Sequence, residues 1–478
     1  MTVNKTFKFI VLILIIWLIF ALITSTLACV FDKTLSENAK KYFSNLNYFG
    51  NKGEGPDRAC IIEAPVDALN IRFEIIKNSK KSLDIVYYKI ADSISTRAFL
   101  KEVVDAANRG VKIRLLVDGK ISYISGVEFN NIIKVLNSNP NIECRVYNKF
   151  NPLKPWSLHM LLHDKFIISD NEMLLLGGRN IDERHFGPNH FNKAITNDRD
   201  VFICKTENST EVESSIDQCL KYMDSLWNYE NSTKVKEVKN NRISEKYNNS
   251  FEEASAQFQR ENPQFYEKTL EDYKNFTVPT AKITLIHNPI ESKKKEPWVG
   301  YTLQRIALNS KDSITLQTPY STGNKDLLLT LGKCAPNVEL TMITNSAAST
   351  PNLPAFSNYL GHRKKFIDTG ANIYEFQSKD SIHEKSLVFD RRLSAIGTFN
   401  LDDRSLYLDT ESMLVIDSEE LAQNLSEIMN EIKSQSLKVG HNNDYINSEN
   451  VVMVPVSPVK KVALKITYYI LRPVQFLL

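Results

Sequence analysis

Apolar residues along this 478-residue chain follow two alternating periods, one typical of helices and one typical of strands. The helical period covers 68–77 and 95–108. Short apolar runs rich in β-branched residues at 82–88 and 111–117 predict strands. A strand, a helix and a strand at this spacing form a right-handed crossover with parallel strands. The pattern therefore predicts an α/β fold.

The same order of elements occurs a second time. A helix expected at 127–136 and a strand expected at 142–147 complete the first series. Because the chain is too long for one hydrophobic core, we expect two domains of similar architecture, produced by internal duplication. The second series comprises strands at 313–320, 338–344 and 372–376 and helices at 325–331 and 358–368.

The two predicted domains occupy 60–227 and 281–440. Between them, 228–280 is rich in Asn, Lys, Glu and Ser and has few strongly apolar residues, which predicts a polar linker with helical pieces. Two further segments, 1–29 and 441–478, lie outside both domains and are more apolar.

The N-terminal segment 1–29 is apolar enough to interact with a membrane. Residues 9–27 are nearly all apolar and follow Lys5 and Lys8, and about 20 such residues cross a bilayer. The segment fits an uncleaved anchor, a cleaved secretory signal, or a signal ending at a lipid-attached Cys29. The lysines favour a cytoplasmic start, which places the domains outside a bacterial cell membrane.

The C-terminal segment 441–478 is shorter in its apolar part. Residues 462–471 carry aliphatic and aromatic side chains behind Lys460 and Lys461, and they are too few to span a bilayer. They predict a helix that lies on a membrane surface or packs on the body.

Composition narrows the class of protein. Hydrophobic residues make up 42% and charged residues 24%, as in ordinary globular proteins. The net charge of +3 gives no support for a dedicated nucleic-acid binder. Besides Cys29 there are five cysteines without zinc-site spacing, so we expect core thiols, with one unassigned disulfide as the alternative.

One motif carries the candidate chemistry, because it occurs twice. The pattern is His-x-Lys-x-x-x-x-Asp, followed in both copies by a glycine and an asparagine. In a chain with eight histidines, two matched copies by chance are implausible. The residues are His163, Lys165, Asp170 and Asn180 in the first copy and His383, Lys385, Asp390 and Asn400 in the second.

Such a pair suits phosphodiester chemistry if the duplicated domains face each other about a pseudo-twofold axis. One neutral imidazole attacks phosphorus to form a phosphohistidine, while the other gives its proton to the leaving alkoxide. The lysines and asparagines stabilise the phosphoryl oxygens, so no metal and no other cofactor is expected. A carboxylate should orient the far nitrogen of each ring. Glu411 and Asp200 are our candidates, with surface ion pairing or strand capping as the alternative.

The motifs resemble the signature of the phospholipase D superfamily. Segment 396–405, with Glu411 after it, is similar to the bacterial cardiolipin synthase branch, and 174–181 resembles its first-half counterpart. The resemblance implies two α/β/α sandwich domains with mixed sheets and a covalent phosphohistidine without metal. It also implies that Asp170 and Asp390, which we count in the catalytic set, orient or support the site and do not attack.

The resemblance further implies a phosphatidyltransferase that acts on phospholipids, with phosphatidylglycerol as substrate and cardiolipin as product. Hydrolysis by a phospholipase D is the alternative, and a nuclease is disfavoured by the near-neutral charge and by export. Family precedent favours His163 as the nucleophile, although both copies are complete. Asp409 stands where the branch usually has asparagine, which bears on the acceptor. The expected partners are phospholipids and the membrane, without nucleic acid; the oligomeric state is not predicted.

Overall fold

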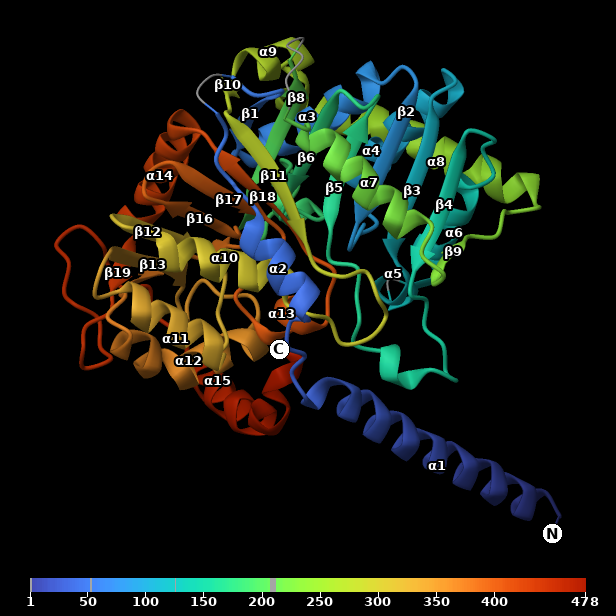
Figure 1. Ribbon diagram of the computed structural model, residues 1–478. Coiled ribbons are helices and arrows are strands. Elements are labelled where there is room, and N and C mark those ends of the chain that lie inside the picture. The colour runs from blue at the N-terminus through green and yellow to red at the C-terminus, as the bar shows by residue number, and fades with distance from the viewer. Residues whose placement is uncertain (1, 52–53, 125, 207–211) are drawn as a thin grey trace.

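Two mixed sheets, each accompanied by helices, lie side by side in the computed structural model (Figure 1). The structure describes residues 2–51, 54–124, 126–206 and 212–478. The α/β fold class expected from the alternating periods is confirmed.

The first sheet has nine strands in the order β10-β1-β8-β6-β5-β2-β3-β4-β9. Its strands β2, β3 and β4 are parallel to one another, and β5 pairs antiparallel with β2. Its strands are β1 (Asp57–Ile62), β2 (Ser82–Tyr87), β3 (Lys112–Asp118), β4 (Ile142–Tyr147), β5 (Lys165–Ser169), β6 (Met173–Gly177), β8 (Asp200–Lys205), β9 (Ser232–Lys234) and β10 (Val278–Pro279). The helices of this part are α3 (Pro65–Asn78), α4 (Ile94–Asn108), α5 (Gly119–Ile124), α6 (Gly126–Leu136), α7 (Ser215–Trp227), α8 (Asn241–Glu261) and α9 (Leu270–Asn275), with the 3-10 turns η1 (Pro155–Ser157), η2 (Glu183–His185) and η3 (Pro263–Tyr266).

The second sheet has eight strands in the order β11-β18-β17-β16-β12-β13-β14-β19. Here too three strands, β12 to β14, are parallel, and β16 pairs antiparallel with β12. Its strands are β11 (Lys282–His287), β12 (Ser313–Gln317), β13 (Glu339–Asn345), β14 (Asn372–Phe376), β16 (Ser386–Phe389), β17 (Leu393–Gly397), β18 (Ser412–Asp417) and β19 (Ser436–Lys438). The helices are α10 (Trp298–Asn309), α11 (Lys325–Cys334), α12 (Leu353–Asp368), α13 (Asp403–Tyr407) and α14 (Glu419–Ser434).

The two sheets share one topology. The run β8-β6-β5-β2-β3-β4 of the first corresponds strand by strand to β18-β17-β16-β12-β13-β14 of the second. The duplication inferred from the repeated motif is therefore visible in the backbone, and each motif begins at the same strand of its sheet.

A continuous apolar core joins the halves. Helix α7 packs against β11 of the second sheet, and α14 packs against β1 of the first. Met223 on α7, Leu425 on α14, Leu176 on β6 and Ile396 on β17 are fully buried in a single cluster. Burial of this kind is the main stabilising term of a fold, so it holds the halves in one relative position.

The polar stretch 228–280 contributes to the first half more than a linker would. Helix α8 packs along α4, and Tyr247, Phe251, Ala254 and Phe258 are its buried residues. Their spacing of four, three and four residues puts all of them on one helical face. Few apolar residues were enough to dock this helix, because the rest of its surface faces solvent.

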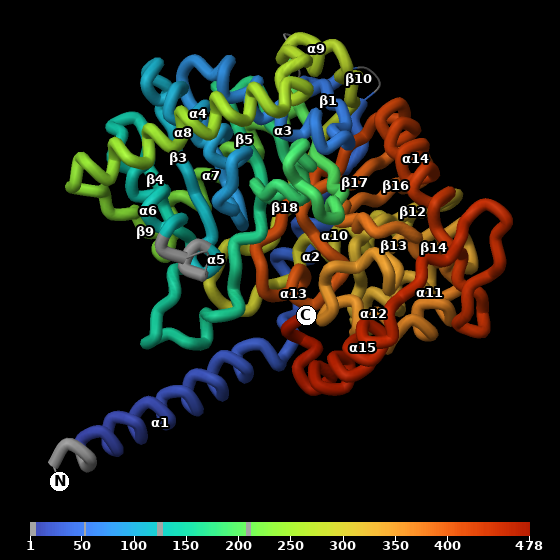
Figure 2. Tube along the Cα trace, turned by 180° about the vertical axis from the view of Figure 1, so that it is seen from behind, coloured from blue at the N-terminus to red at the C-terminus, as the bar shows by residue number. Residues whose placement is uncertain are grey.

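The apolar N-terminal helix α1 (Thr2–Val30) projects from the body in both views (Figures 1 and 2). Within the described residues, one helix is long and apolar enough to cross a membrane by length and composition. It covers Thr6–Val30, with a mean hydropathy of 2.9 and 6% of the tested window buried. The short α2 (Glu37–Asn45) follows it.

The C-terminal segment forms α15 (Pro458–Leu471) and the 3-10 turn η4 (Arg472–Leu477). Helix α15 packs against α12, with Leu464 as its buried residue. All six cysteines are buried and free, so the expected core thiols are confirmed and no disulfide is formed among them.

Candidate active site

Each motif histidine lies just before the central strand of its own half and is held by the backbone of the other half. The His163 amide donates to the Thr410 carbonyl at 3.2 Å, and the His383 amide donates to the Asn197 carbonyl at 2.8 Å. The second contact continues a small parallel sheet, formed by β15 (Ser381–Ile382) and β7 (Thr196–Asn197). These backbone hydrogen bonds between the halves place both motifs at the boundary between them.

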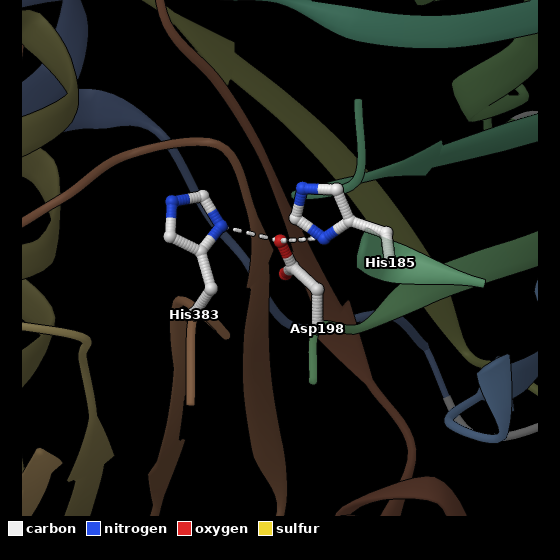
Figure 3. Close-up of side chains that lie close together, drawn as sticks. All are labelled: His185, Asp198 and His383. Carbon is white, nitrogen blue, oxygen red and sulfur yellow. Dashed lines mark hydrogen bonds and ion pairs between the residues drawn. The ribbon is translucent and has the colours of Figure 1, made fainter. Parts of the chain in front are cut away.

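A buried carboxylate from the opposite half contacts each ring. His163 Nδ1 lies 2.9 Å from Glu411 Oε1. His383 Nδ1 lies 2.6 Å from Asp198 Oδ2, and Figure 3 shows this second contact. Glu411 and Asp198 are both fully buried. The acidic side chain orients each ring through Nδ1. Lys385 Nζ also lies 2.8 Å from Nδ1 and 3.2 Å from Nε2 of His383. The two contacts are reciprocal, since each half supplies one histidine and also the carboxylate that contacts the histidine of the other half.

The expectation of Asp200 as the orienting carboxylate is corrected to Asp198. Strand pairing places Gly177 opposite Asp200 and Gly397 opposite Met413, so Asp200 corresponds to Met413 and Asp198 to Glu411. Asp200 instead accepts hydrogen bonds from two buried arginines, Arg72 and Arg179, both at 3.0 Å.

The motif lysines are buried directly beneath the histidines. Lys165 and Lys385 are 1% and 2% exposed, and each ammonium donates to the carbonyl of its own motif histidine. Lys385 Nζ also lies 3.9 Å from Asp198 Oδ2. Each half therefore supplies one cation to the floor of the site, as the motif spacing predicts.

The motif aspartates lie outside the site. Asp170 accepts from the backbone amides of Lys80, Lys81 and Ser82 at 2.7–2.9 Å. Asp390 does the same for the backbone amides of residues 311–313. Both aspartates have positive φ, in the turns that follow β5 and β16. They clamp the start of β2 and of β12, so their inclusion in the catalytic set is wrong and the supporting role implied by the resemblance fits.

The two asparagines occupy matched positions after β6 and β17. Asn180 and Asn400 are 3% and 4% exposed. Each has an amide oxygen without a hydrogen-bond partner among the described residues. Buried polar atoms are rarely left so, which favours ligand contacts from both amides.

Burial controls the protonation of the site. It lowers the pKa of His163 and of His383 well below the ordinary value of 6.5, and the neighbouring lysines add to the effect. Burial also lowers the pKa of Lys165 to about 7 and raises the pKa of Glu411 well above its usual range. The free site therefore keeps its imidazoles neutral, as nucleophilic attack requires.

A third histidine, missed by the sequence analysis, faces the Asp198 carboxylate. His185 in η2 is fully buried, its ring lies 5.6 Å from that of His383, and its Nδ1 lies 3.9 Å from Asp198 Oδ2 (Figure 3). Neither ring nitrogen has a hydrogen-bond partner in the described chain. His185 lies four residues after segment 174–181, which resembled the family, and this proximity was the available signal.

His185, Asp198 and His383 offer three ligand atoms within 4.8 Å of one another, the only such group found among the described residues. This set fits a divalent ion poorly, because the Lys385 ammonium already lies beside the one carboxylate. An ion there would have to displace or deprotonate the lysine.

A cavity of about 400 Å³ opens beside His383. It gives a ligand access to one edge of the site. Its lining includes Arg184, Tyr320, Asn345, Asn352 and Leu353.

Asp409, the departure from the family pattern, has a structural partner. Arg404 donates to both of its carboxylate oxygens, at 3.0 and 3.1 Å, and the Leu161 amide donates to it at 3.3 Å. The extra charge relative to asparagine is thus neutralised within the protein.

Comparisons with known proteins agree on one family. A family model described as "Cardiolipin synthase, PLD-like domain" matches residues 73–227 and 303–433, more than half of the chain. A Helicobacter pylori J99 protein described as uncharacterized is 28% identical over 442 residues, covering 84% of this chain and 81% of its own. Cardiolipin synthase C of Escherichia coli K12 is 26% identical and covers 76% of this chain and 82% of its own.

The fold agrees as well. Phosphatidylserine synthase of Haemophilus influenzae Rd KW20 superposes with a TM-score of 0.64 at 14% identity, covering 92% of this chain and 99% of its own. This likeness shows a shared fold and, with the family match above, leaves no conflict between sequence and structure. The chain belongs to the phospholipase D-like family that carries the cardiolipin synthase, PLD-like domain.

Proposed function

We propose that this protein is a membrane-bound phosphatidyltransferase of the cardiolipin-synthase type, which acts on phosphatidylglycerol through a phosphohistidine. The observation that carries the proposal is the reciprocal pair of contacts, His163 with Glu411 and His383 with Asp198. They orient two neutral imidazoles from duplicated halves, with a buried lysine beside each.

The first half-reaction opens the phosphodiester. His163, favoured by family precedent, attacks phosphorus through Nε2, so that an N–P bond forms as the P–O bond to the leaving glycerol breaks. His383, protonated once substrate is bound, donates its proton to the leaving oxygen. Asp198 stabilises the imidazolium of His383 before this transfer.

The second half-reaction closes a new phosphodiester. His383, now neutral, removes the proton from the hydroxyl of a second phosphatidylglycerol. That oxygen attacks phosphorus, the N–P bond breaks, and its electron pair returns to His163. The product is cardiolipin, and both histidines regain their starting states.

The lysines and asparagines stabilise charge on phosphorus. Lys165 and Lys385 supply ammonium groups toward the non-bridging oxygens, and the Nδ2 groups of Asn180 and Asn400 donate to the same oxygens. Charge stabilisation of this kind is strongest where water is excluded. The burial of both lysines meets that condition.

The test is a lipid assay with the full-length protein in vesicles of phosphatidylglycerol, with and without phosphatidylethanolamine. We expect cardiolipin and free glycerol by mass spectrometry, and no product from the His163→Ala or His383→Ala variant. Absence of cardiolipin from every mixture would overturn the proposal. Phosphatidic acid without any transfer product would select hydrolysis, and nicking of plasmid DNA in EDTA would select a nuclease.

The nucleophile can be identified in the same system. Brief reaction with phosphatidylglycerol radiolabelled in its phosphatidyl group, followed by denaturation without acid, traps the phosphohistidine. We expect the label on the peptide that contains His163. A label on the peptide of His383 would exchange the two roles and leave the rest of the proposal unchanged.

A further inference from the structure

An exposed apolar loop precedes the first motif. Segment 149–158 leaves β4 and leads into the backbone that delivers His163. Lys149 and Lys154 lie within it. Its large exposed side chains are Phe150 at 38%, Leu153 at 80%, Trp156 at 41% and Leu158 at 40%. Clustered apolar side chains on a protein surface mark an interaction site.

Part of the backbone of this loop is satisfied within the loop itself. Pro152 and Pro155 have no N–H group, and the amides of Lys154, Ser157 and Leu158 donate to carbonyls inside the loop. The Leu153 amide donates to the Asn151 side chain at 2.9 Å. Unpaired backbone groups are what excludes ordinary loops from lipid.

The loop lies beside the apolar helix α1. Trp17 Nε1 donates to the Pro152 carbonyl at 3.0 Å, and α1 contacts both η1 and η4. Trp17 is 13 residues before Val30, about 20 Å along a helix. If α1 spans a bilayer, its contact with Pro152 places the loop alongside the membrane-spanning part of the helix and not at the end where α1 joins the body.

A second exposed apolar stripe belongs to α15. Its spacing of three and four residues places the stripe on one helical face, and Lys460, Lys461 and Lys465 flank it. The exposed residues are Val459, Val462, Ile466, Tyr469 and Ile470. In both views α15 and the attached end of α1 lie on the side of the molecule opposite α9 (Figures 1 and 2).

We propose that segment 149–158 and α15, here called the membrane face, insert together with α1 into a bilayer that contains anionic phospholipid. The apolar side chains enter the acyl region, and the interspersed lysines meet the headgroups. This inference deepens the proposed function, because it states how a lipid substrate reaches the site.

Arg404 connects the membrane face to the catalytic backbone. Its Nη2 donates to the His159 carbonyl at 2.8 Å, at the end of the loop, and its amide donates to the Leu478 carbonyl at 3.0 Å, after α15. Its partner Asp409 holds the Leu161 amide, two residues before His163. Insertion of the membrane face into the bilayer therefore sets the position of the active site relative to the bilayer.

The first test measures insertion without turnover. The full-length Trp17→Phe variant is placed in vesicles of phosphatidylglycerol whose acyl chains are brominated. We expect the brominated lipid to quench part of the tryptophan emission. In a Trp17→Phe, Trp156→Phe variant this quenched part should be absent, which assigns it to Trp156. Trp227 and Trp298 remain as unquenched internal references. Trp156 emission that resists bromine but is quenched by aqueous iodide would overturn the proposal.

The second test separates docking from chemistry. Leu153→Asp is compared with Phe276→Asp, an equally drastic change at a side chain 57% exposed beside α9, far from the membrane face. Turnover is measured on vesicles and on short-chain monomeric phospholipid. We expect the ratio of vesicle to monomer turnover to fall roughly tenfold for Leu153→Asp, as for a charge moved toward lipid, and to stay at the wild-type value for Phe276→Asp.

An unchanged ratio in Leu153→Asp, or an equal loss on both substrates, would overturn the docking role. If the wild-type protein turns over no lipid at all, the proposed function fails. The bromine quenching of Trp156 still decides this inference in that case.

Discussion

At the scale of single residues, the carboxylates decide how the motif histidines behave. Asp198 and Asp200 are two positions apart in sequence, yet one contacts His383 and the other closes a buried cluster with Arg72 and Arg179. A spacing pattern within one half could not distinguish them, since the partner histidine comes from the other half. The register of β6 against β8 makes the distinction.

Exchanging each of these aspartates for asparagine should separate the two roles. Asp198→Asn removes the carboxylate that orients His383, so we expect turnover to fall at least about 100-fold, with stability near wild type. Asp200→Asn leaves two buried guanidinium groups poorly compensated and should lower the free energy of unfolding by about 3–5 kcal/mol. Lipid turnover and urea denaturation check the pair. The reverse assignment of effects would refute the register argument.

The lowered pKa of Lys165 predicts proton uptake when an anion binds. At pH 8, above its pKa of about 7, the free lysine is mostly neutral, and a tetrahedral oxyanion beside it raises the pKa. Tungstate binding should therefore take up as much as about one proton, measured by calorimetry in two buffers of different ionisation enthalpy. Lys165→Arg, which stays charged at this pH, should take up fewer protons, because only the uptake at His383 remains. Equal uptake in both proteins would contradict the assignment.

Removal of divalent metal should not change turnover. The Lys385 ammonium lies beside the Asp198 carboxylate, the anionic member of the group formed with His185 and His383. Turnover in EDTA should equal turnover in buffer treated with chelating resin and then supplied with Mg²⁺. Restoration of activity by one metal ion after its loss in EDTA would show a resident cation.

At the scale of elements, local pattern was sufficient wherever a helix or strand buries a regular face. The expected helix at 95–108 and strand at 111–117 differ from α4 and β3 by one residue at most at either end. Elements made of two residues, such as β7 and β15, carry no periodic signal, and these join the halves at the site. Helix α8 was not recognised as part of the first half for a different reason, because the polar residues of its solvent-facing side dominate its composition.

Helix α8 should be tightly coupled to the stability of the first half. Phe251 is fully buried in the core cluster that includes α4, and Phe251→Ala should lower the free energy of unfolding by about 3–5 kcal/mol. The exposed neighbour in Glu253→Ala serves as the control, with an expected change within about 0.5 kcal/mol. Equal, small changes in urea denaturation would mean that 228–280 is only a linker.

At the scale of the whole molecule, one site is assembled from two halves of one chain. The shared core of α7, α14 and both sheets fixes their relation, and the backbone exchanges at His163 and His383 complete it. The resemblance of the motifs to a known family predicted this arrangement. The cross-contacts themselves depend on packing between residues 248 and 185 positions apart, which no local pattern encodes.

Mixing two inactive variants tests whether each chain builds its own site. Equal amounts of His163→Ala and His383→Ala protein should remain inactive after mixing, unfolding and refolding together, because each site needs both histidines of one chain. A wild-type sample carried through the same cycle controls for refolding. Partial recovery in the mixture would show sites assembled between two chains by exchange of halves.

The reciprocal pairing also constrains how such a sequence can change. His383 depends on a carboxylate encoded 185 positions earlier, and His163 on one encoded 248 positions later. After the ancestral duplication, neither copy could drift freely, because a substitution in one copy impairs the histidine of the other. Descendants of this chain should therefore alter the members of each pair together or lose activity. A shuffled protein that joins halves from distant relatives should fail first at these two contacts.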